Sequence, residues 1–336
     1  MSRAGSLAGV VGLLTLALSA PAARAADEAA EAGKWTVISD GVTDKLTAEG
    51  KKIGYPGLTA GVSVDAKNGD VYMVVCDQGL WKSTDQGKSF TRVDGGKVGG
   101  RCETGFALNA DPAGGRLMCF MVYGGSALTT DGGKTFTPSK SSHVDFGAVD
   151  WEATGKAMLM LRHESGGMLT FSDDAGATWH DLGKGFQSLV GVFDPQTLIA
   201  SKGDGILRST DGGKTWKKVS DAQPSGAVVK VRNGVGFLVG EDGLLVSKDK
   251  GASWELLGER VKAVWGPYFG KNDSHLIVVG EKGVLETTDA GKTWTVIAPL
   301  PPEFKARPAY ANFAYDAQRN ILYASTMGKP TYKLQR

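Results

Sequence analysis

The octet "STDGGKTW" (209–216) has close copies along the whole chain. Six copies are present: "STDQGKSF" (83–90), "TTDGGKTF" (129–136), "SDDAGATW" (172–179), "STDGGKTW" (209–216), "SKDKGASW" (247–254) and "TTDAGKTW" (287–294). Their third positions are aspartates: Asp85, Asp131, Asp174, Asp211, Asp249 and Asp289. Successive aspartates are 46, 43, 37, 38 and 40 residues apart. A period near 40 residues predicts a repeat architecture, and a four-stranded propeller blade takes about this length.

The segments between the octets follow one pattern. A short apolar run ends at Asp or Asn, as in "GVSVD" (61–65), and a turn and a second run follow, as in "VYMVV" (71–75). A Gly-containing turn then leads into a third run that enters the octet, and a fourth run leaves its aromatic residue, as in "WTVIA" (294–298). Runs rich in Val, Ile and Leu and broken by Gly and Asp predict strands. Because no later segment shows sustained helical spacing, we expect an all-β chain.

The two ends of the repeat region complement each other. "GKWTVI" (33–38) matches the fourth strand of a unit, whereas "ANFAYD" (311–316), "ILYAST" (321–326) and "TYKLQ" (331–335) supply the first three. A seventh blade assembled from both ends would close the ring and leave no open sheet edge. We therefore predict a seven-bladed β-propeller over residues 26–336, with six blades and loose ends as the alternative.

The first 25 residues have the pattern of a cleaved secretory signal. A basic residue at Arg3 precedes an apolar run (7–20), and small residues flank Arg24 at the expected cleavage site. The run is too short for a comfortable membrane span, and no later segment reaches that length. We expect an exported protein, periplasmic or extracellular, with no membrane span.

The charge is balanced, with 38 Lys and Arg against 36 Asp and Glu. Nucleic-acid binding relies on concentrated positive charge, so we expect no nucleic-acid partner. The three cysteines, Cys76, Cys102 and Cys119, match no metal-binding spacing, and their odd number leaves at least one free thiol. Buried free cysteines or one disulfide bond are both compatible with the sequence. We expect a monomer without a metal or cofactor.

The octet pattern Ser/Thr-x-Asp-x-Gly-x-Ser/Thr-aromatic resembles the Asp-box, also called the bacterial neuraminidase repeat. Asp and Ser/Thr side chains can bond nearby backbone N–H groups and hold a tight hairpin between the third and fourth strands. Each turn offers one fixed carboxylate, whereas calcium takes six to eight oxygen ligands, so we interpret the aspartates as structural. The resemblance implies that these turns lie on the rim, away from the central pocket.

A ligand is then expected on the face opposite the boxes, where the turns between second and third strands meet the links between blades. The catalytic candidates there are Asp77, Glu103, Asp145 and Glu164. The ligand-binding candidates are Arg101, Tyr123, His143, Arg162, His163, Arg307 and Tyr310. Carboxylates, histidines and arginines in one cleft suit a polar ligand. The competing interpretation is that any single one is an ordinary solvated loop residue.

The sequence resembles two classes of enzyme in part, sialidases and xyloglucanase-type hydrolases. Sialidases share the box but carry a substrate-binding arginine before the first blade, and "IGYPGLTAG" (53–61) has none. Xyloglucanase-type hydrolases place an acid where "CDQGLWKS" (76–83) has Asp77. Inverting hydrolysis needs two carboxylates about 6.5–9.5 Å apart, and these enzymes use a second propeller to supply the partner acid.

"GFLVGEDGLLVSKDKGASW" (236–254) and "HLIVVGEKGVLETTDAGKTW" (275–294) resemble the repeats of photosystem II assembly-factor propellers and their relatives. That resemblance implies an exported scaffold that holds partner proteins. We therefore predict a binding or assembly module for a protein or glycan ligand. The alternative is a glycoside hydrolase or polysaccharide lyase on the same fold, since propellers host both classes.

Overall fold

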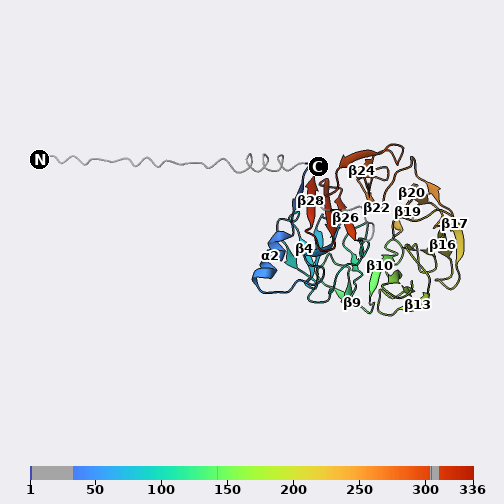
Figure 1. Cartoon of the computed structure of the whole chain (residues 1–336), viewed down its shortest axis with the longest axis horizontal. Coiled ribbons are helices and arrows are strands. Elements are labelled where there is room, and N and C mark those ends of the chain that lie inside the picture. Colours follow the sequence, from blue (N-terminus) through green and yellow to red (C-terminus); the bar gives the residue numbers. More distant parts are fainter. Residues whose placement is uncertain (2–32, 142, 303, 305–309) are drawn as a thin grey trace.

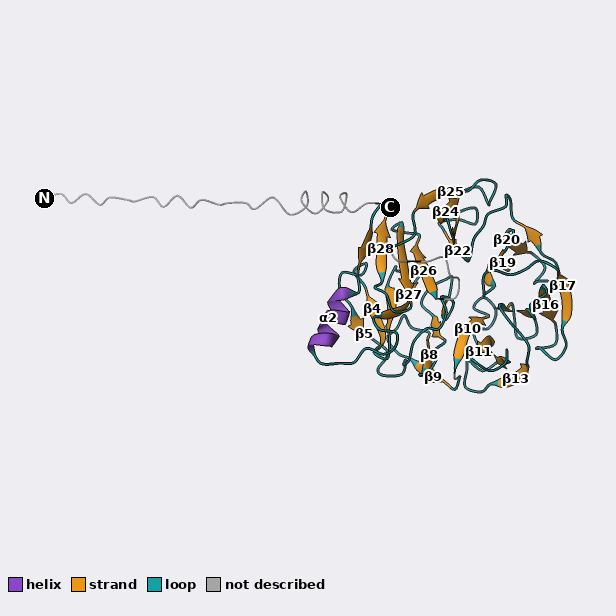
Figure 2. Ribbon diagram, viewed as in Figure 1, coloured by secondary structure: helices purple, strands orange, loops and turns teal. Residues whose placement is uncertain are grey.

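The computed structural model describes residue 1 and residues 33–141, 143–302, 304 and 310–336. These residues form seven four-stranded antiparallel sheets arranged around a common centre (Figures 1 and 2). Neighbouring sheets contact one another mainly through their first strands, and a bridge between Val190 and Val228 links the fourth sheet to the fifth, which fixes the order around the ring. The prediction of a seven-bladed all-β propeller is confirmed.

Blades 1 to 4 follow one another along the chain. Blade 1 comprises β2 (Thr59–Val64), β3 (Val71–Val75), β4 (Gly79–Ser83) and β5 (Thr91–Arg92). Blade 2 comprises β6 (Leu108–Ala110), β7 (Leu117–Cys119), β8 (Ser126–Thr129) and β9 (Thr137–Ser139). Blade 3 comprises β10 (Val144–Val149), β11 (Met158–Arg162), β12 (Leu169–Ser172) and β13 (His180–Gly183). Blade 4 comprises β14 (Val190–Val192), β15 (Leu198–Ala200), β16 (Ile206–Ser209) and β17 (Lys217–Ser220).

Blades 5 to 7 complete the ring. Blade 5 comprises β18 (Lys230–Arg232), β19 (Val235–Gly240), β20 (Gly243–Ser247) and β21 (Glu255–Leu256). Blade 6 comprises β22 (Trp265–Phe269), β23 (Leu276–Gly280), β24 (Gly283–Thr287) and β25 (Thr295–Ala298). Blade 7 comprises β26 (Ala311–Asp316), β27 (Ile321–Thr326), β28 (Tyr332–Gln335) and β1 (Trp35–Val37).

Blade 7 is assembled from both ends of the repeat region, as predicted. Its order is β1-β28-β27-β26, and β1 pairs with β28 in the register Trp35 to Leu334. The pairing covers the free edge of β28 and ties the first described strand to the last. The expected signal segment and its cleavage site lie outside the described residues.

Within the part of the chain that the structure describes, one helix departs from the all-β expectation. α2 (Asp40–Ala48) runs between β1 and β2 in the chain and lies beside β4 and β5 (Figure 2). Its Val42 and Leu46 pack on Met73 and Trp81 of blade 1. Two apolar residues four apart are enough for one helical face but too few for a recognisable pattern in the sequence. No helix among the described residues is long and apolar enough to cross a membrane.

The Asp-box turns are held by a repeated set of hydrogen bonds. In blade 1 the Ser83 hydroxyl donates to Asp85 Oδ1 at 2.7 Å, and the Gly87 and Ser89 N–H groups donate to Ser83 Oγ and Asp85 Oδ1 at 2.8 and 2.9 Å. Equivalent bonds occur in the other five boxes. Hydrogen bonds from the turn outweigh partial desolvation and lower the pKa of the Asp85 carboxyl to about 2.

The box glycine also lies where two blades meet. Gly213 has φ 86°, and a Cβ there would lie 2.4 Å from Leu182 Cδ1 of the preceding blade. In blade 5 a Cβ at Gly251 would lie 2.4 Å from Ile199 Cδ1. The position therefore requires glycine twice, for its left-handed backbone and for the close approach of the neighbouring blade.

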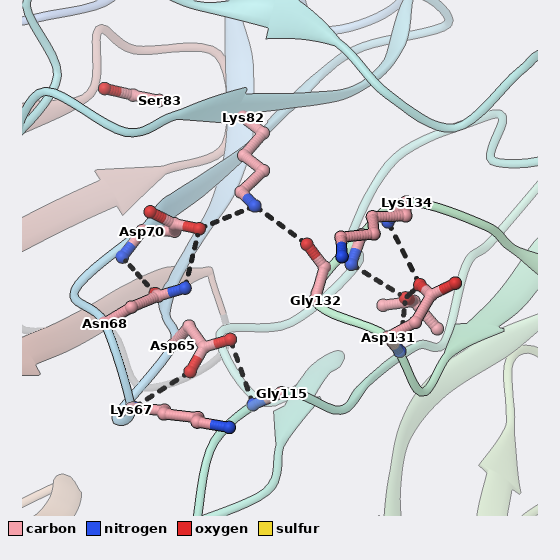
Figure 3. A network of polar contacts seen from close by, with 12 residues as sticks. Asp65, Lys67, Asn68, Asp70, Lys82, Ser83, Gly115, Asp131, Gly132 and Lys134 are labelled. Carbon is pink, nitrogen blue, oxygen red and sulfur yellow. Dashed lines mark hydrogen bonds and ion pairs between the residues drawn. The ribbon is translucent and has the colours of Figure 1, made fainter.

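The boxes share one face of the ring with the turns between first and second strands. The Gly132 N–H donates to Gly115 O at 2.8 Å, which joins the blade 2 box to its own first turn. Lys82 of blade 1 pairs with Asp70 at 2.6 Å and donates to Gly132 O at 2.8 Å (Figure 3). We call this side the box face, and the opposite side, with the second-to-third turns and the links between blades, the loop face.

All three cysteines are buried and unpaired. Burial raises the pKa of the Cys76 thiol to about 12 and that of Cys102 well above its usual value. Of the two states that the sequence left open, the structure has three neutral thiols packed in the core of blades 1 and 2.

Candidate functional site

Polar side chains gather on the loop face above blades 1 to 3. We call this group the loop-face cluster, and its members are Tyr55, Arg101, Glu103, Tyr123, His143, Asp145, His163 and Glu164. They come from the links that enter blades 1, 2 and 3, from the start of β10, and from the second-to-third turns of blades 2 and 3. Residues far apart in the sequence thus converge where neighbouring blades present their loops.

Arg101 is the centre of the cluster. Its Nη2 lies 2.8 Å from Glu103 Oε2, and both side chains are largely buried. The guanidinium carbon lies 5.3 Å from the Tyr55 ring centroid and 4.9 Å from that of Tyr123, so the cation sits between two aromatic rings. Cation–π attraction and the ion pair together fix the orientation of both tyrosines.

A carboxylate, an imidazole and a phenol form a chain beside Arg101. His163 Nδ1 lies 2.7 Å from Asp145 Oδ1, and its Nε2 lies 3.1 Å from the Tyr123 hydroxyl. The Tyr123 hydroxyl also donates to Glu164 Oε2 at 3.4 Å. Burial raises the pKa of Asp145 above its usual value, against the opposing hydrogen bond from His163. Partial desolvation and the Glu164 carboxylate raise the pKa of Tyr123.

The structure brings together seven of the predicted site residues. They are Glu103, Asp145, Glu164, Arg101, Tyr123, His143 and His163. His143 joins the group through its ring, which meets that of Tyr123 edge-on with centroids 4.9 Å apart.

The other predicted residues lie around this group. Arg162 turns toward Asp181, with Nη1 3.8 Å from Oδ1, and lines an open surface hollow together with His143, His163, Glu164 and Lys184. Asp77 is exposed, and its N–H donates to Gly100 O at 2.8 Å, beside Arg101. Tyr310 is 41% exposed at the start of blade 7. Arg307 lies outside the described residues.

Tyr55 is a member that the sequence analysis missed. It is 75% exposed, and with Tyr123 at 48% and Tyr310 at 41% it places three exposed tyrosines on the loop face. In the sequence, the segment "IGYPGLTAG" (53–61) is informative mainly for its lack of arginine. Its place in the link that enters blade 1, next to the Asp77 turn, is the signal that could have pointed to it.

A second site, which the sequence did not reveal, lies at the centre of the ring. A cavity of about 440 Å³ is lined by first strands and by their turns on the box face, including Asp111, Glu152 and Gln318. No residue of the six boxes lines it. Lys230 of β18 contributes to its wall, with Nζ 4.1 Å from the Tyr268 ring centroid. Loss of hydration lowers the pKa of Lys230 to about 7.

The described residues contain no group of three His, Cys, Asp or Glu side chains placed to hold a metal ion.

The comparisons agree with this architecture. Residues 207–218 match the family model described as BNR/Asp-box repeat, and no curated protein matches the chain. The fold is similar to YCF48 bound to D1 peptide, at 13% identity and TM-score 0.52, covering 84% of this chain and 93% of that one. The resemblances to the Asp-box repeat and to assembly-factor propellers are thus confirmed, at an identity that shows the fold alone.

Two GH74 enzymes have folds that are similar to the same degree. The Niastella koreensis GH74 enzyme matches at 16% identity and TM-score 0.53, covering 84% of this chain and 53% of that one. An ancestral GH74 enzyme matches at 16% identity and TM-score 0.51, covering 84% and 45%. The chain spans about half the length of these two enzymes. The chain is a seven-bladed β-propeller that carries six copies of the Asp-box pattern.

Proposed function

We propose that this chain is a binding module that holds a segment of a partner protein on its loop face. The observation that carries the proposal is the Arg101 guanidinium held between the exposed rings of Tyr55 and Tyr123. Tyrosine and arginine are enriched at the energetic centres of protein interfaces. A propeller of similar fold, YCF48, has a structure in complex with D1 peptide, which supports a peptide ligand here.

The surface suits binding because its side chains are already ordered. Glu103 and two rings hold Arg101, while His163 and the edge of His143 hold Tyr123. A ligand therefore meets rigid aromatic area and loses little conformational entropy of the protein on docking. Tyr310 extends the aromatic surface toward blade 7.

The proposal includes export to the periplasm or the extracellular space, and action as a monomer. The basic start and apolar run of residues 1–25 support export. An exported module with a protein partner would serve in assembly of that partner, as the resemblance to assembly-factor propellers implies.

The test is capture of a protein partner on the immobilised protein and measurement of the affinity. Tyr55→Ala combined with Tyr123→Ala is expected to weaken binding at least tenfold, because hot-spot truncations cost about 2 kcal/mol or more. The matched control is Val296→Ala on the outer strand β25, where the side chain is 50% exposed. Equal affinity of the double variant and the control would contradict the proposal.

A glycan-active enzyme is the second candidate. The observation that favours it is the chain from Asp145 through His163 to Tyr123, which could move a proton at an exposed phenol. Incubation with plant and bacterial polysaccharides tests it. Product that disappears with His163→Gln or Asp77→Asn would support a hydrolase or lyase. Absence of product across the panel, together with stoichiometric capture of a protein, would eliminate it.

A further inference from the structure

The carboxylates that line the central cavity are occupied by donors of the protein. Glu152 of blade 3 accepts from the Asn233 and Gly234 N–H groups of blade 5 at 2.6 and 2.8 Å. Asp111 accepts from Arg116 Nε at 2.6 Å and from a backbone N–H. Asp111 is thus paired with Arg116, Glu152 is held by backbone N–H groups, and neither carboxylate forms an ion pair with Lys230 among the described residues.

Lys230 differs from these groups. Among the described residues no carboxylate forms an ion pair with its amino group, and its recorded contact is the face of the Tyr268 ring, 4.1 Å away. Arg232, two residues further on, also lines the cavity, but its guanidinium pairs with Asp273 and lies over the Phe269 ring. Burying an amine without an acidic partner costs folding free energy. A bound anion would offset part of that cost.

The walls around Lys230 are largely apolar. Trp151, Tyr268 and Phe313 present aromatic surface, and Phe106, Val149 and Val228 present further apolar surface. A volume of about 440 Å³ lies within the range of small-molecule pockets, which combine apolar walls with a few orienting polar groups. A cation set in such a wall favours a ligand that combines an anionic group with an apolar body.

We propose that the central cavity binds a small organic carboxylate, with its anionic group on the Lys230 ammonium and its apolar body against Trp151, Tyr268 and Phe313. The site opens on the box face and does not depend on the loop-face function. The bound carboxylate would supply the ion-pair partner that Lys230 lacks among the described residues.

Binding should be coupled to proton uptake. Burial lowers the pKa of Lys230 to about 7, and a bound carboxylate would raise it again, so the complex takes up a proton above pH 7. The other titratable groups that line the cavity are Arg232, Lys271, Asp111, Glu152, Tyr268 and Tyr315. Two of these are cations and two are carboxylates already bonded to the protein. Affinity is therefore expected to fall as pH rises above 7.

The experiment uses 2-naphthoate as the probe and 2-naphthalenemethanol as its neutral counterpart, with calorimetry at pH 7.5 in two buffers of different ionisation enthalpy. The acid is expected to bind roughly tenfold to a hundredfold more tightly than the alcohol, the range for a charge-assisted hydrogen bond, with uptake of a proton. Lys230→Met should remove both the preference and the uptake. Lys230→Arg should keep the preference, and Lys271→Met at the exposed rim should behave like wild type.

Equal binding of acid and alcohol by the wild-type protein, or saturable binding of neither, would overturn the proposal. Loss of the preference in Lys271→Met but not in Lys230→Met would also overturn it. If Lys230→Met does not fold, proton uptake by the wild-type protein and the behaviour of Lys230→Arg decide the outcome.

Discussion

The loop-face cluster and the central cavity treat charge in opposite ways. In the cluster each central charge has a partner, because Arg101 pairs with Glu103 and His163 with Asp145, and the exposed groups are tyrosine rings. In the cavity Glu152 and Asp111 accept hydrogen bonds from protein donors, and no carboxylate among the described residues pairs with Lys230. The first arrangement suits a large, rigid surface for a macromolecule, whereas the second suits one enclosed anion.

Acid should disturb the two faces in sequence. Burial raises the pKa of Asp145, so this loop-face carboxylate is protonated at a higher pH than the box aspartates. The box aspartates have pKa values of about 2 against the usual 3.8, so their stabilisation is present above pH 3.8 and lost as pH falls toward 2. We expect cooperative unfolding between about pH 4 and pH 2, followed by tryptophan fluorescence. A fold that survives unchanged at pH 2 would show that the boxes contribute little.

Lys230→Met should stabilise the protein. Below pH 7 the native state carries a desolvated ammonium that the unfolded chain hydrates, so removing it should raise the free energy of unfolding by roughly 1–4 kcal/mol at pH 6. The gain should shrink as pH rises from 7 toward 10, because the amine then becomes neutral in the native state. Urea titrations at pH 6 and pH 9 measure it. A destabilised variant at pH 6 would contradict the account of this lysine.

Arg101→Met should destabilise the protein, whereas Lys230→Met should stabilise it. It leaves Glu103 largely buried without its cation and removes the group between Tyr55 and Tyr123, so we expect a loss of about 1–3 kcal/mol in unfolding free energy. The same urea titration at pH 7 applies. Arg208→Met is the control, since the Arg208 guanidinium bonds only a backbone carbonyl, that of Lys250, within the described structure. If both substitutions lowered the unfolding free energy equally, the paired Arg101 would contribute no more than an ordinary surface arginine. The contrast between cluster and cavity would then be lost.

The smallest effect is expected for Tyr123→Phe. The ring stays over Arg101, and the phenol loses one bond to His163 and a long one to Glu164, so the free energy of unfolding should change by about 1 kcal/mol or less. Partner affinity should fall much less than with the double tyrosine-to-alanine variant. A loss of affinity as large as in that variant would indicate that the Tyr123 hydroxyl and its bond to His163, not the aromatic rings, dominate partner binding.

The fold could be predicted because its determinants are local and repeated. Each octet fixes one hairpin within eight residues, and the complementary ends determined how the ring closes. The helix α2 could not be predicted, because Val42 and Leu46 alone do not make a helical pattern.

The site could be predicted only in part. Turn position identified Tyr123, His163 and Glu164 as neighbours, since loops of adjacent blades meet on one face. The cavity could not be foreseen, because Lys230 in "VVKVRN" (228–233) looks like any lysine on a strand. Its isolation depends on where Glu152 and Asp111 point, and that is set by contacts between blades distant in sequence.

The central claim is that a macromolecular partner docks on the loop face around Tyr55 and Tyr123. Photo-cross-linking measures this directly, with p-benzoylphenylalanine placed at position 55 and, as the control, at position 318 on the cavity rim. We expect position 55 to give one cross-linked partner that Arg101→Met abolishes and Lys230→Met leaves unchanged, with no such product from position 318. A partner that cross-links from position 318 and not from position 55 would contradict the account.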